Sequence, residues 1–478
     1  MIQDRVLARF VGFIRTYALA LVAALAVGAS SAWLLLRHPI IGIADNRDFW
    51  RVMQPTGVGY CDLIEETVFR FIQERLGFTP PRHVDYLTSE LLFTKLAIAI
   101  QRYVIGGARF SLRLFGAVHL PFYLVAIALF VAAQRRRSWP AQLFLAAFAW
   151  LVFRDVKLVA HFNSFYSESA SLIFGLFLVA FALWACEPSP EPGARWLNYG
   201  CFIAAVVLFA VAKSQNLVFL FALAPLAYAL FPSARVDALV VGGRRRLLAL
   251  LVAVALVAIV PWALTSNAYD LTRGVNARVH LDEELLPHSP TPNRDRWELG
   301  IRGHDYSAVS LGTLARFYLR HPLRWWQLAS RAMHEAFSYI AYGNYDRSVG
   351  KPPGTNDLRC SLWSELNHRW APRWLPFDIV LTWLLAIAWL RRARSPLVAV
   401  ADRRRALVGL ALLAGAVGEF IVTITFEANG NAKHLFIFNV IVWIVVMLAL
   451  TDVVDALVIR RRRAPQSRRR SKGEYRLS

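Results

Sequence analysis

The sequence predicts an all-α polytopic membrane protein of about ten transmembrane helices, with amphipathic interfacial helices in its first outer segment. Hydrophobic residues make up 57% of the 478 residues and charged residues only 18%, whereas a soluble domain carries about 25% charged residues. The apolar residues form runs of about twenty, which is the length that crosses a bilayer. Short arginine blocks separate these runs, as they do on the cytoplasmic side of membrane helices.

The apolar runs place ten spans along the chain. An even number of spans puts both termini on one side, and the basic tail from Arg460 to Lys472 makes that side cytoplasmic. We therefore expect a membrane domain over residues 1–458 and a basic cytoplasmic tail over residues 459–478. The ten spans are residues 17–36, 113–134, 140–154, 168–186, 196–212, 216–232, 247–266, 374–391, 405–425 and 434–458.

The net charge of +22 follows from this topology. Every strong basic block falls in a predicted inside loop, and the blocks form no stripe along a folded surface, which argues against a nucleic-acid partner. The tail also suits contact with anionic lipid headgroups. The blocks are Arg135–Arg137, Arg195, Arg235 with Arg244–Arg246, Arg391–Arg405 and the tail.

Five segments then lie on the outer side, and two of them are long. In the first, residues 61–76 and 89–104 are amphipathic and indicate helices that lie in the membrane interface or pack on a small external domain. In the second, the stretch RHPLRWW places tryptophans beside arginines, as interfacial helices do. The outer segments are residues 37–112, 155–167, 213–215, 267–373 and 426–433.

The four cysteines do not indicate a metal site, because the sequence has no CxxC or Cys/His spacing of that kind. Cys186 and Cys201 lie near span ends. Cys61 and Cys360 lie in the two long outer segments, where an oxidising compartment would permit a disulfide.

An acidic motif, ADNRDF, follows the first span and contains Asp45 and Asp48. Two carboxylates three residues apart share a face if the turn is helical. Such a pair could supply a general base and a ligand for substrate or metal. The alternative is a helix cap in a solvated loop, and the motif in isolation favours that alternative.

A second motif, HFNSFYSES, enters the fourth span and contains His161, Asn163, Tyr166 and Glu168. Glu168 precedes an apolar run, where an ionised carboxylate is costly unless it has a partner. Alternatively, it complements the dipole at the start of a helix. The density of polar groups in so short a stretch favours a functional role.

A third motif, AKSQN, forms a very short outer turn between two spans and contains Lys213, Gln215 and Asn216. Lys213 departs from the positive-inside pattern, and an outer lysine in a tight turn can bind an anion such as a phosphate. The alternative, which is equally compatible with the sequence, is a lysine that extends toward the lipid headgroups.

The fourth motif, TFEANGNAKHLFIFN, fills the last outer turn and contains Glu427, Lys433 and His434. Asn429 and Gly430 indicate a turn. Lys433 and His434 place two more cationic groups on the outer side, close to the bilayer. In the alternative interpretation, His434 pairs with Glu427.

Together the four motifs put carboxylates and cations on one face, each at a boundary between loop and membrane. This combination suits a substrate with an anionic, lipid-anchored part and a polar part. The carboxylates would act on a hydroxyl or a sugar, while Lys213, Lys433 and His434 would hold a phosphate.

In order and placement, these motifs resemble a GT-C type glycosyltransferase. More narrowly, DFWRVM, HFNSFYSES, AKSQN, HPLRW and NAKHLFIFN resemble the WsfD-like hexose transferases of bacterial glycan biosynthesis. The resemblance runs from about residue 40 to about residue 440. The chain lacks the WWD-type signature and the large soluble C-terminal domain of oligosaccharyltransferases, so the resemblance implies no peptide acceptor.

The resemblance implies a polyprenyl-phosphate-linked sugar donor, a glycan or lipid acceptor, and a place in the bacterial cytoplasmic (inner) membrane with the active site facing the periplasm. It implies cell-envelope glycan synthesis without a cofactor or a metal ion. By carry-over, Asp45 or Asp48 is the general base, and Glu168 orients the acceptor or helps to hold a metal. The predicted substrate-binding residues are His161, Asn163, Tyr166, Lys213, Gln215, Asn216, Glu427, Lys433 and His434.

Two other classes remain as alternatives. An O-antigen ligase or polymerase would use external arginine and histidine residues in a large late loop. Arg294, Arg296, Arg302, His304 and Arg320 occupy such a loop. A lipid or sugar transporter would carry charges in the middle of its spans. The span centres here are nearly free of charge, and Glu419 is the main exception.

Overall fold

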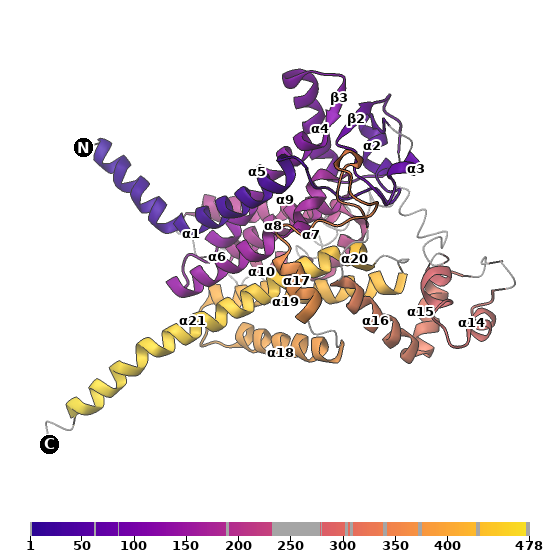
Figure 1. Ribbon diagram of the computed structural model, residues 1–478. Coiled ribbons are helices and arrows are strands. Elements are labelled where there is room, and N and C mark those ends of the chain that lie inside the picture. The colour runs from indigo at the N-terminus through magenta and orange to yellow at the C-terminus, as the bar shows by residue number, and fades with distance from the viewer. Residues whose placement is uncertain are drawn as a thin grey trace.

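The protein is mostly helical, and helices account for 73% of it. The computed structural model therefore confirms the predicted all-α polytopic class (Figure 1). It describes residues 2–61, 64–84, 86–187, 191–231, 278, 280–301, 305, 309–337, 342–370, 375–426 and 431–474.

Six helices of the described chain contain stretches long and apolar enough to cross a membrane, and each matches a predicted span. These stretches are Thr16–Leu36, Leu112–Ala132, Glu168–Ala185, Gly193–Ala212, Val400–Thr425 and Phe436–Ile459. They belong to α1 (Ile2–Leu36), α5 (Leu112–Ala132), α8 (Glu168–Ala185), α9 (Pro192–Ala212), α19 (Val400–Phe426) and α21 (Phe436–Glu474).

Three further predicted spans are also helical. The two short ones correspond to α6 (Trp139–Phe153) and to the pair η3 (Ser214–Phe219) and α10 (Leu220–Leu230). The span predicted at 374–391 corresponds to α18 (Leu375–Arg394), a helix of 20 residues that contains Asp378 in its first turn and three arginines in its last. The span predicted at 247–266 lies outside the described residues.

The helices form one bundle, with α8 near its centre. The span of α8 is 78% buried, because α5, α9 and α21 all pack against it. The helix α1 packs on α5 and α6, while α19 packs on α10, α18 and α21. In Figure 1 the start of α1 and the end of α21 extend from the same end of the bundle. The smaller helices and strands of the outer segments gather at the opposite end.

A network of ion pairs joins the helices at the end of the bundle where the termini emerge. Arg137, between α5 and α6, lies 2.6 Å from Asp452 and 3.2 Å from Asp455, both on α21. It also lies 3.4 Å from Asp402 of α19. Arg392 of α18 reaches Asp452 at 2.6 Å and Asp402 at 3.2 Å. The arginine blocks therefore also bind the helices to one another.

The first outer segment contains a small sheet as well as helices. Its elements are α2 (Trp50–Thr56), β1 (Val58–Gly59), α3 (Ile64–Thr67), β2 (Arg75–Phe78), α4 (Glu90–Ile100), the π-helix η1 (Gln101–Ile105) and β3 (Arg109–Ser111). The strands are antiparallel in the order β1-β2-β3. The helix predicted at 89–104 is confirmed as α4 and η1.

The helix predicted at 61–76 is wrong. Of the residues in this stretch that the structure describes, only α3, four residues long, is helical, and Arg75 and Leu76 belong to β2. Phe69 has a positive φ of 60°, which ends helical geometry, and β2 pairs with both neighbouring strands. The amphipathic pattern is local, whereas strand pairing depends on residues far along the chain, and here the pairing prevails.

The second long outer segment contains η4 (Leu281–Leu285), α14 (Pro292–Glu298), α15 (Leu311–Arg320), α16 (Pro322–Ala336), η5 (Arg347–Val349) and α17 (Leu362–Trp370). Leu285, Leu314 and Phe317 contribute to a small separate core in its first half. Its second half joins the first outer segment, since the Asn344 side chain donates to the Gly42 carbonyl at 2.7 Å. All four cysteines are free, so Cys61 and Cys360 do not form a disulfide.

Candidate active site

The four polar motifs, which are far apart in sequence, meet at the end of the bundle opposite the chain termini. Lys433, on the short helix α20 (Asn431–His434), forms an ion pair with Asp48 in the turn before α2. The same ammonium group lies 3.2 Å from Asn46 Oδ1 and 4.4 Å from the ring centre of Tyr166. The first, second and fourth motifs therefore contact one another through a single lysine.

A second ion pair joins the second and third motifs. Glu168, the first residue of α8, lies 2.9 Å from the Lys213 ammonium group. Glu168 is buried and the Lys213 side chain is mostly so. Lys213 follows α9 directly in extended backbone and precedes η3, so the sharp exit from α9 places it opposite the start of α8. Lys433 also interacts electrostatically with Glu168, which connects the two pairs.

The two aspartates of the first motif have different surroundings. The Asp45 carboxylate is buried; it accepts the Phe49 backbone N–H at 3.0 Å and the Tyr60 hydroxyl at 2.7 Å. Burial raises the pKa of Asp45. The Asp48 carboxylate is partly exposed and also lies 3.4 Å from Arg51. Although burial opposes ionisation, Lys433 and Arg51 hold the pKa of Asp48 well below its usual range.

His434 lies beside Lys433 and contacts the third motif, because Gln215 Nε2 is 3.2 Å from His434 Nδ1. Burial, together with the charges of Lys213 and Lys433, lowers the pKa of His434 to about 3. His434 is therefore neutral at pH 7, and its ring can donate one hydrogen bond and accept another. Lys213 and Lys433 are the cations that form ion pairs in this cluster.

His161 and Tyr166 of the second motif lie beneath this cluster. The His161 ring is fully buried and packs 4.4 Å from the Phe436 ring, and burial lowers the pKa of His161 to about 4. The Tyr166 hydroxyl donates to the Ala44 carbonyl at 2.8 Å and accepts the Asn46 backbone N–H at 2.9 Å. Tyr166 thus fixes the acidic turn and supports Lys433 with its ring.

Two predicted substrate-binding residues serve the scaffold. The buried Asn163 amide donates to the carbonyls of Leu35 and Ile41 at 3.0 and 2.9 Å, and so ties the end of α1 to the turn that follows. The buried Asn216 amide donates to Ser171 Oγ and to the Phe209 carbonyl at 2.9 and 2.8 Å. Their donors are used within the fold. Glu427 lies outside the described residues.

The structure adds residues that sequence reasoning missed. The Tyr86 side chain hydrogen-bonds to Ser167, next to Glu168. The Arg51 guanidinium lies over the Tyr86 ring, 5.4 Å from the ring centre. Tyr342 hydrogen-bonds to Asn46. Asn46 lies within the acidic motif and Arg51 lies two residues after it, and this proximity is the only feature of the sequence that could have indicated them. Nothing in the sequence around Tyr86 and Tyr342 indicates a site.

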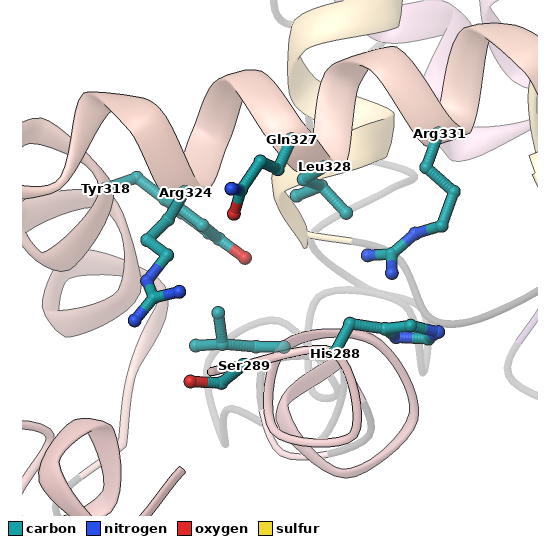
Figure 2. A pocket seen from close by; sticks show the side chains of 8 residues that line it. His288, Ser289, Tyr318, Arg324, Gln327, Leu328 and Arg331 are labelled. Atoms are coloured by element: carbon teal, nitrogen blue, oxygen red, sulfur yellow. The ribbon is translucent and has the colours of Figure 1, made fainter. Parts of the chain in front are cut away.

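A small pocket also lies in the second outer segment. Figure 2 shows Arg324, Gln327 and Arg331 of α16 above His288 and Ser289. Arg324 is bound within the fold, at 2.8 Å from Thr291 Oγ1 and 3.7 Å from Asp295. Of the arginines and histidine weighed for a ligase, Arg302 and His304 lie outside the described residues. No group of three metal-ligating side chains occurs in the part of the chain that the structure describes.

Comparison with known proteins identifies one family. No curated protein and no solved structure matches the chain. A family model described as the YfdI N-terminal transmembrane domain matches residues 8–302 and 300–474, which is nearly the whole chain. The chain therefore belongs to the YfdI N-terminal transmembrane domain family, whose namesake is a GT-C-like membrane glycosyltransferase.

Proposed function

We propose that the protein is a membrane glycosyltransferase that moves a sugar, a hexose, from a polyprenyl-phosphate carrier to a glycan or lipid-linked acceptor. One observation carries the proposal: two carboxylates, Asp48 and Glu168, lie paired with two ammonium groups, Lys433 and Lys213, in one cluster. Sugar transfer from a phosphate needs a base for the acceptor and cations for the leaving group. Family membership supports the same assignment.

Asp48 is the general base in this proposal. The acceptor hydroxyl gives its proton to the Asp48 carboxylate while its oxygen bonds to the anomeric carbon. The bond from that carbon to the phosphate oxygen breaks, and its electron pair leaves with the polyprenyl phosphate. Lys433 and Lys213 stabilise the charge on that phosphate. This matters more than protonating it, because phosphate is already a fair leaving group. No step requires a metal ion.

Donor binding also activates the base. While Lys433 is paired with Asp48, the pKa of that carboxyl lies well below its usual range, so the carboxylate is a weak base. A donor phosphate competes for the Lys433 ammonium and loosens this pair. The pKa of Asp48 then rises and the carboxylate becomes a stronger base. The exchange couples deprotonation of the acceptor to the presence of the donor.

The neighbouring residues hold this arrangement. Asp45 shapes the acidic turn through Phe49 and Tyr60, which favours Asp48 over Asp45 as the base. Glu168 orients the acceptor, and neutral His434 with Gln215 supplies hydrogen bonds to the sugar. We place the site on the periplasmic face of a bacterial inner membrane, with both termini in the cytoplasm. In this proposal the enzyme has a WsfD-like role in the synthesis of envelope glycans.

The test uses membranes that contain the wild type, Asp48→Asn, Asp45→Asn or the surface control Glu66→Gln, which alters an exposed ion pair on the same outer segment. Each is supplied with labelled polyprenyl-phosphate glucose, galactose or mannose, and label in the glycan fraction is measured. We expect Asp48→Asn to lower transfer by about 100-fold or more and Asp45→Asn by less than about tenfold.

Two results would overturn the proposal. Equal transfer by Asp48→Asn and the wild type excludes Asp48 as the base. If wild-type membranes transfer none of the three sugars above the level of membranes without the protein, the hexosyltransferase function is wrong.

A further inference from the structure

A buried ion pair lies behind the candidate site, between the juxtamembrane helix α4 and the span α5. Glu90 Oε1 is 2.8 Å from His119 Nε2, and both side chains are fully buried. The His119 ring packs between Phe93, Phe115 and Phe162, with ring centres 4.6, 4.6 and 5.4 Å away. Apolar residues of similar size would fill such a space at no greater cost, so the pair calls for another explanation.

Glu90 also binds the start of the helix that carries Glu168. Its second oxygen, Oε2, accepts the backbone N–H of Ala170 at 3.0 Å. Ala170 lies in the first turn of α8, two residues after Glu168. The N–H groups of a first helical turn have no partner inside the helix, and an anion placed there is also favoured by the helix dipole. Glu90 therefore fixes the turn from which Glu168 projects.

The two residues before Glu90 bind the end of α9, the helix that Lys213 follows. The Thr88 hydroxyl donates to the Ala212 carbonyl at 2.7 Å, and the Ser89 hydroxyl donates to the Leu208 carbonyl at 2.9 Å. Both carbonyls lie in the last turns of α9, and Lys213 follows Ala212 directly. Three consecutive residues, Thr88 to Glu90, thus hold the end of α9 and the start of α8 at a set distance.

His119 keeps this arrangement electrically neutral. His119 Nδ1 lies 2.9 Å from the Phe115 carbonyl, which only accepts, so Nδ1 carries a hydrogen. The contact between Nε2 and Glu90 then holds one further proton, on the imidazole or on the carboxyl. The pair has no net charge in either case. Without His119, an ionised Glu90 would place a second negative charge beside Glu168 at the same helix end.

We propose that Thr88, Ser89 and Glu90 are positioning residues that fix the Glu168–Lys213 pair, with His119 neutralising Glu90. The inference rests on the proposed function for its catalytic consequence, but the spacing of the pair can be measured without any activity. A carboxylate and an ammonium group must be held to within about 0.5 Å to act on one substrate. This segment supplies that constraint from outside α8 and α9.

The direct readout is the reactivity of Lys213 toward an amine-methylating reagent in the detergent-solubilised full chain, measured by mass spectrometry. The ion pair keeps Lys213 protonated and slows its reaction. A loosened pair lowers the pKa of this lysine, and each unit changes the reactive neutral fraction about tenfold. Glu168→Gln, which removes the carboxylate, gives the reaction rate of Lys213 without this ion pair.

Three Glu90 variants separate hydrogen bonding from packing. Glu90→Ala and Glu90→Leu lose the bond to Ala170, and we expect both to raise Lys213 reactivity at least about fivefold toward the rate in Glu168→Gln. Glu90→Gln can still accept the Ala170 N–H and donate to neutral His119, so it should keep the wild-type rate. Thr88→Val, which loses the bond to α9 and the acceptor for the Glu90 backbone N–H but keeps the Glu90 carboxylate, should raise the rate severalfold.

Two other lysines serve as internal controls. Lys95 is exposed on α4 and should react equally in every variant. Lys157 is buried, with its ammonium group 3.0 Å from the Ala336 carbonyl, and remains protected unless the fold is lost. A variant in which Lys157 reacts has unfolded, and Thr88→Val then decides the question.

The two possible failures can be told apart. If Lys213 reactivity in Glu90→Ala and Thr88→Val equals that of the wild type, the positioning role is wrong. If reactivity rises as expected but wild-type membranes transfer no sugar, the positioning role stands and the proposed function fails. If the positioning role and the proposed function are both correct, Glu90→Ala should lower kcat at least about tenfold, while Glu90→Gln should keep the wild-type kcat.

Discussion

Asp45 and Asp48 are three residues apart, yet their carboxylates lie in different surroundings. Asp45 is turned inward, where Tyr60 and the Phe49 N–H occupy its oxygens. Asp48 faces Lys433 and Arg51. His434 shows the same dependence on surroundings, because burial and two nearby lysines keep neutral a side chain that would be half-protonated near pH 6.5 in water.

The lowered pKa of His434 predicts a loss of stability in acid. The unfolded chain binds a proton near pH 6.5, whereas the native His434 binds one only near pH 3. Below pH 6.5 the unfolded state therefore binds more protons than the native state, and stability falls as the pH falls through this range. At pH 5 this effect amounts to at most about 2 kcal/mol.

Thermal unfolding in detergent between pH 7.5 and pH 5 checks this prediction. His434→Gln should lose less stability than the wild type over that range, because it cannot take up the proton. His83→Gln, at an exposed position, is the matched control and should follow the wild type. Identical acid sensitivity in His434→Gln and the wild type would contradict the prediction.

At the scale of elements, short polar segments determine how the helix ends near the candidate site meet. Asp155 begins α7 (Val156–Val159), which leads into η2 (Ala160–Asn163) and then into α8. Its fully buried carboxylate accepts the Lys157 N–H at 2.9 Å, the Ser364 N–H at 2.8 Å and the Ser364 hydroxyl. One side chain thus joins the turn before the site to α17.

We predict that Asp155→Ala lowers the free energy of unfolding by about 3 kcal/mol, because it leaves buried backbone donors without an acceptor. Ser364→Ala, which removes only the hydroxyl and keeps both backbone bonds, should cost about 1 kcal/mol. Thermal unfolding in detergent compares the two variants. Equal losses would show that the three-way contact of Asp155 is not what stabilises this junction.

At the scale of the whole molecule, charges perform different tasks at the two ends of the bundle. At the end that carries the candidate site, Lys433 pairs with Asp48 and Lys213 with Glu168, and these are the groups to which the proposed function assigns the reaction. At the other end, Arg137 is almost fully buried among carboxylates of α19 and α21. The proposal therefore gives the first set of charges a part in the reaction, whereas the Arg137 network joins helices to one another.

This difference predicts that Arg137→Met destabilises the bundle strongly, by about 3 kcal/mol, because it leaves several partly buried carboxylates without their shared cation. Arg136→Met is the matched control, since Arg136 is half-exposed and should contribute less than about 1 kcal/mol. Unfolding temperature in detergent measures both. Equal unfolding temperatures for the two variants would mean that the buried network does not hold the helices.

Much of the fold could be predicted from the sequence because hydropathy is a local property. A run such as Glu168–Ala185 indicates a span whatever its neighbours are. The stretch 61–76 could not be assigned in this way, because β2 exists only through its pairing with β1 and β3. Tyr86 and Glu90 were missed as site residues for a similar reason, since in sequence Glu90 is simply the first residue of an amphipathic helix.

The sequence by itself determined the class of the protein, most of its spans, and the concentration of carboxylates and lysines in four short motifs. Only the tertiary structure decided that Lys433 pairs with Asp48 and Lys213 with Glu168, that Asn163 and Asn216 serve the scaffold, and that Thr88 to Glu90 join α9 to α8. Hydropathy acts along the chain, whereas an ion pair forms between side chains that packing brings within a few ångströms, however far apart they are in sequence.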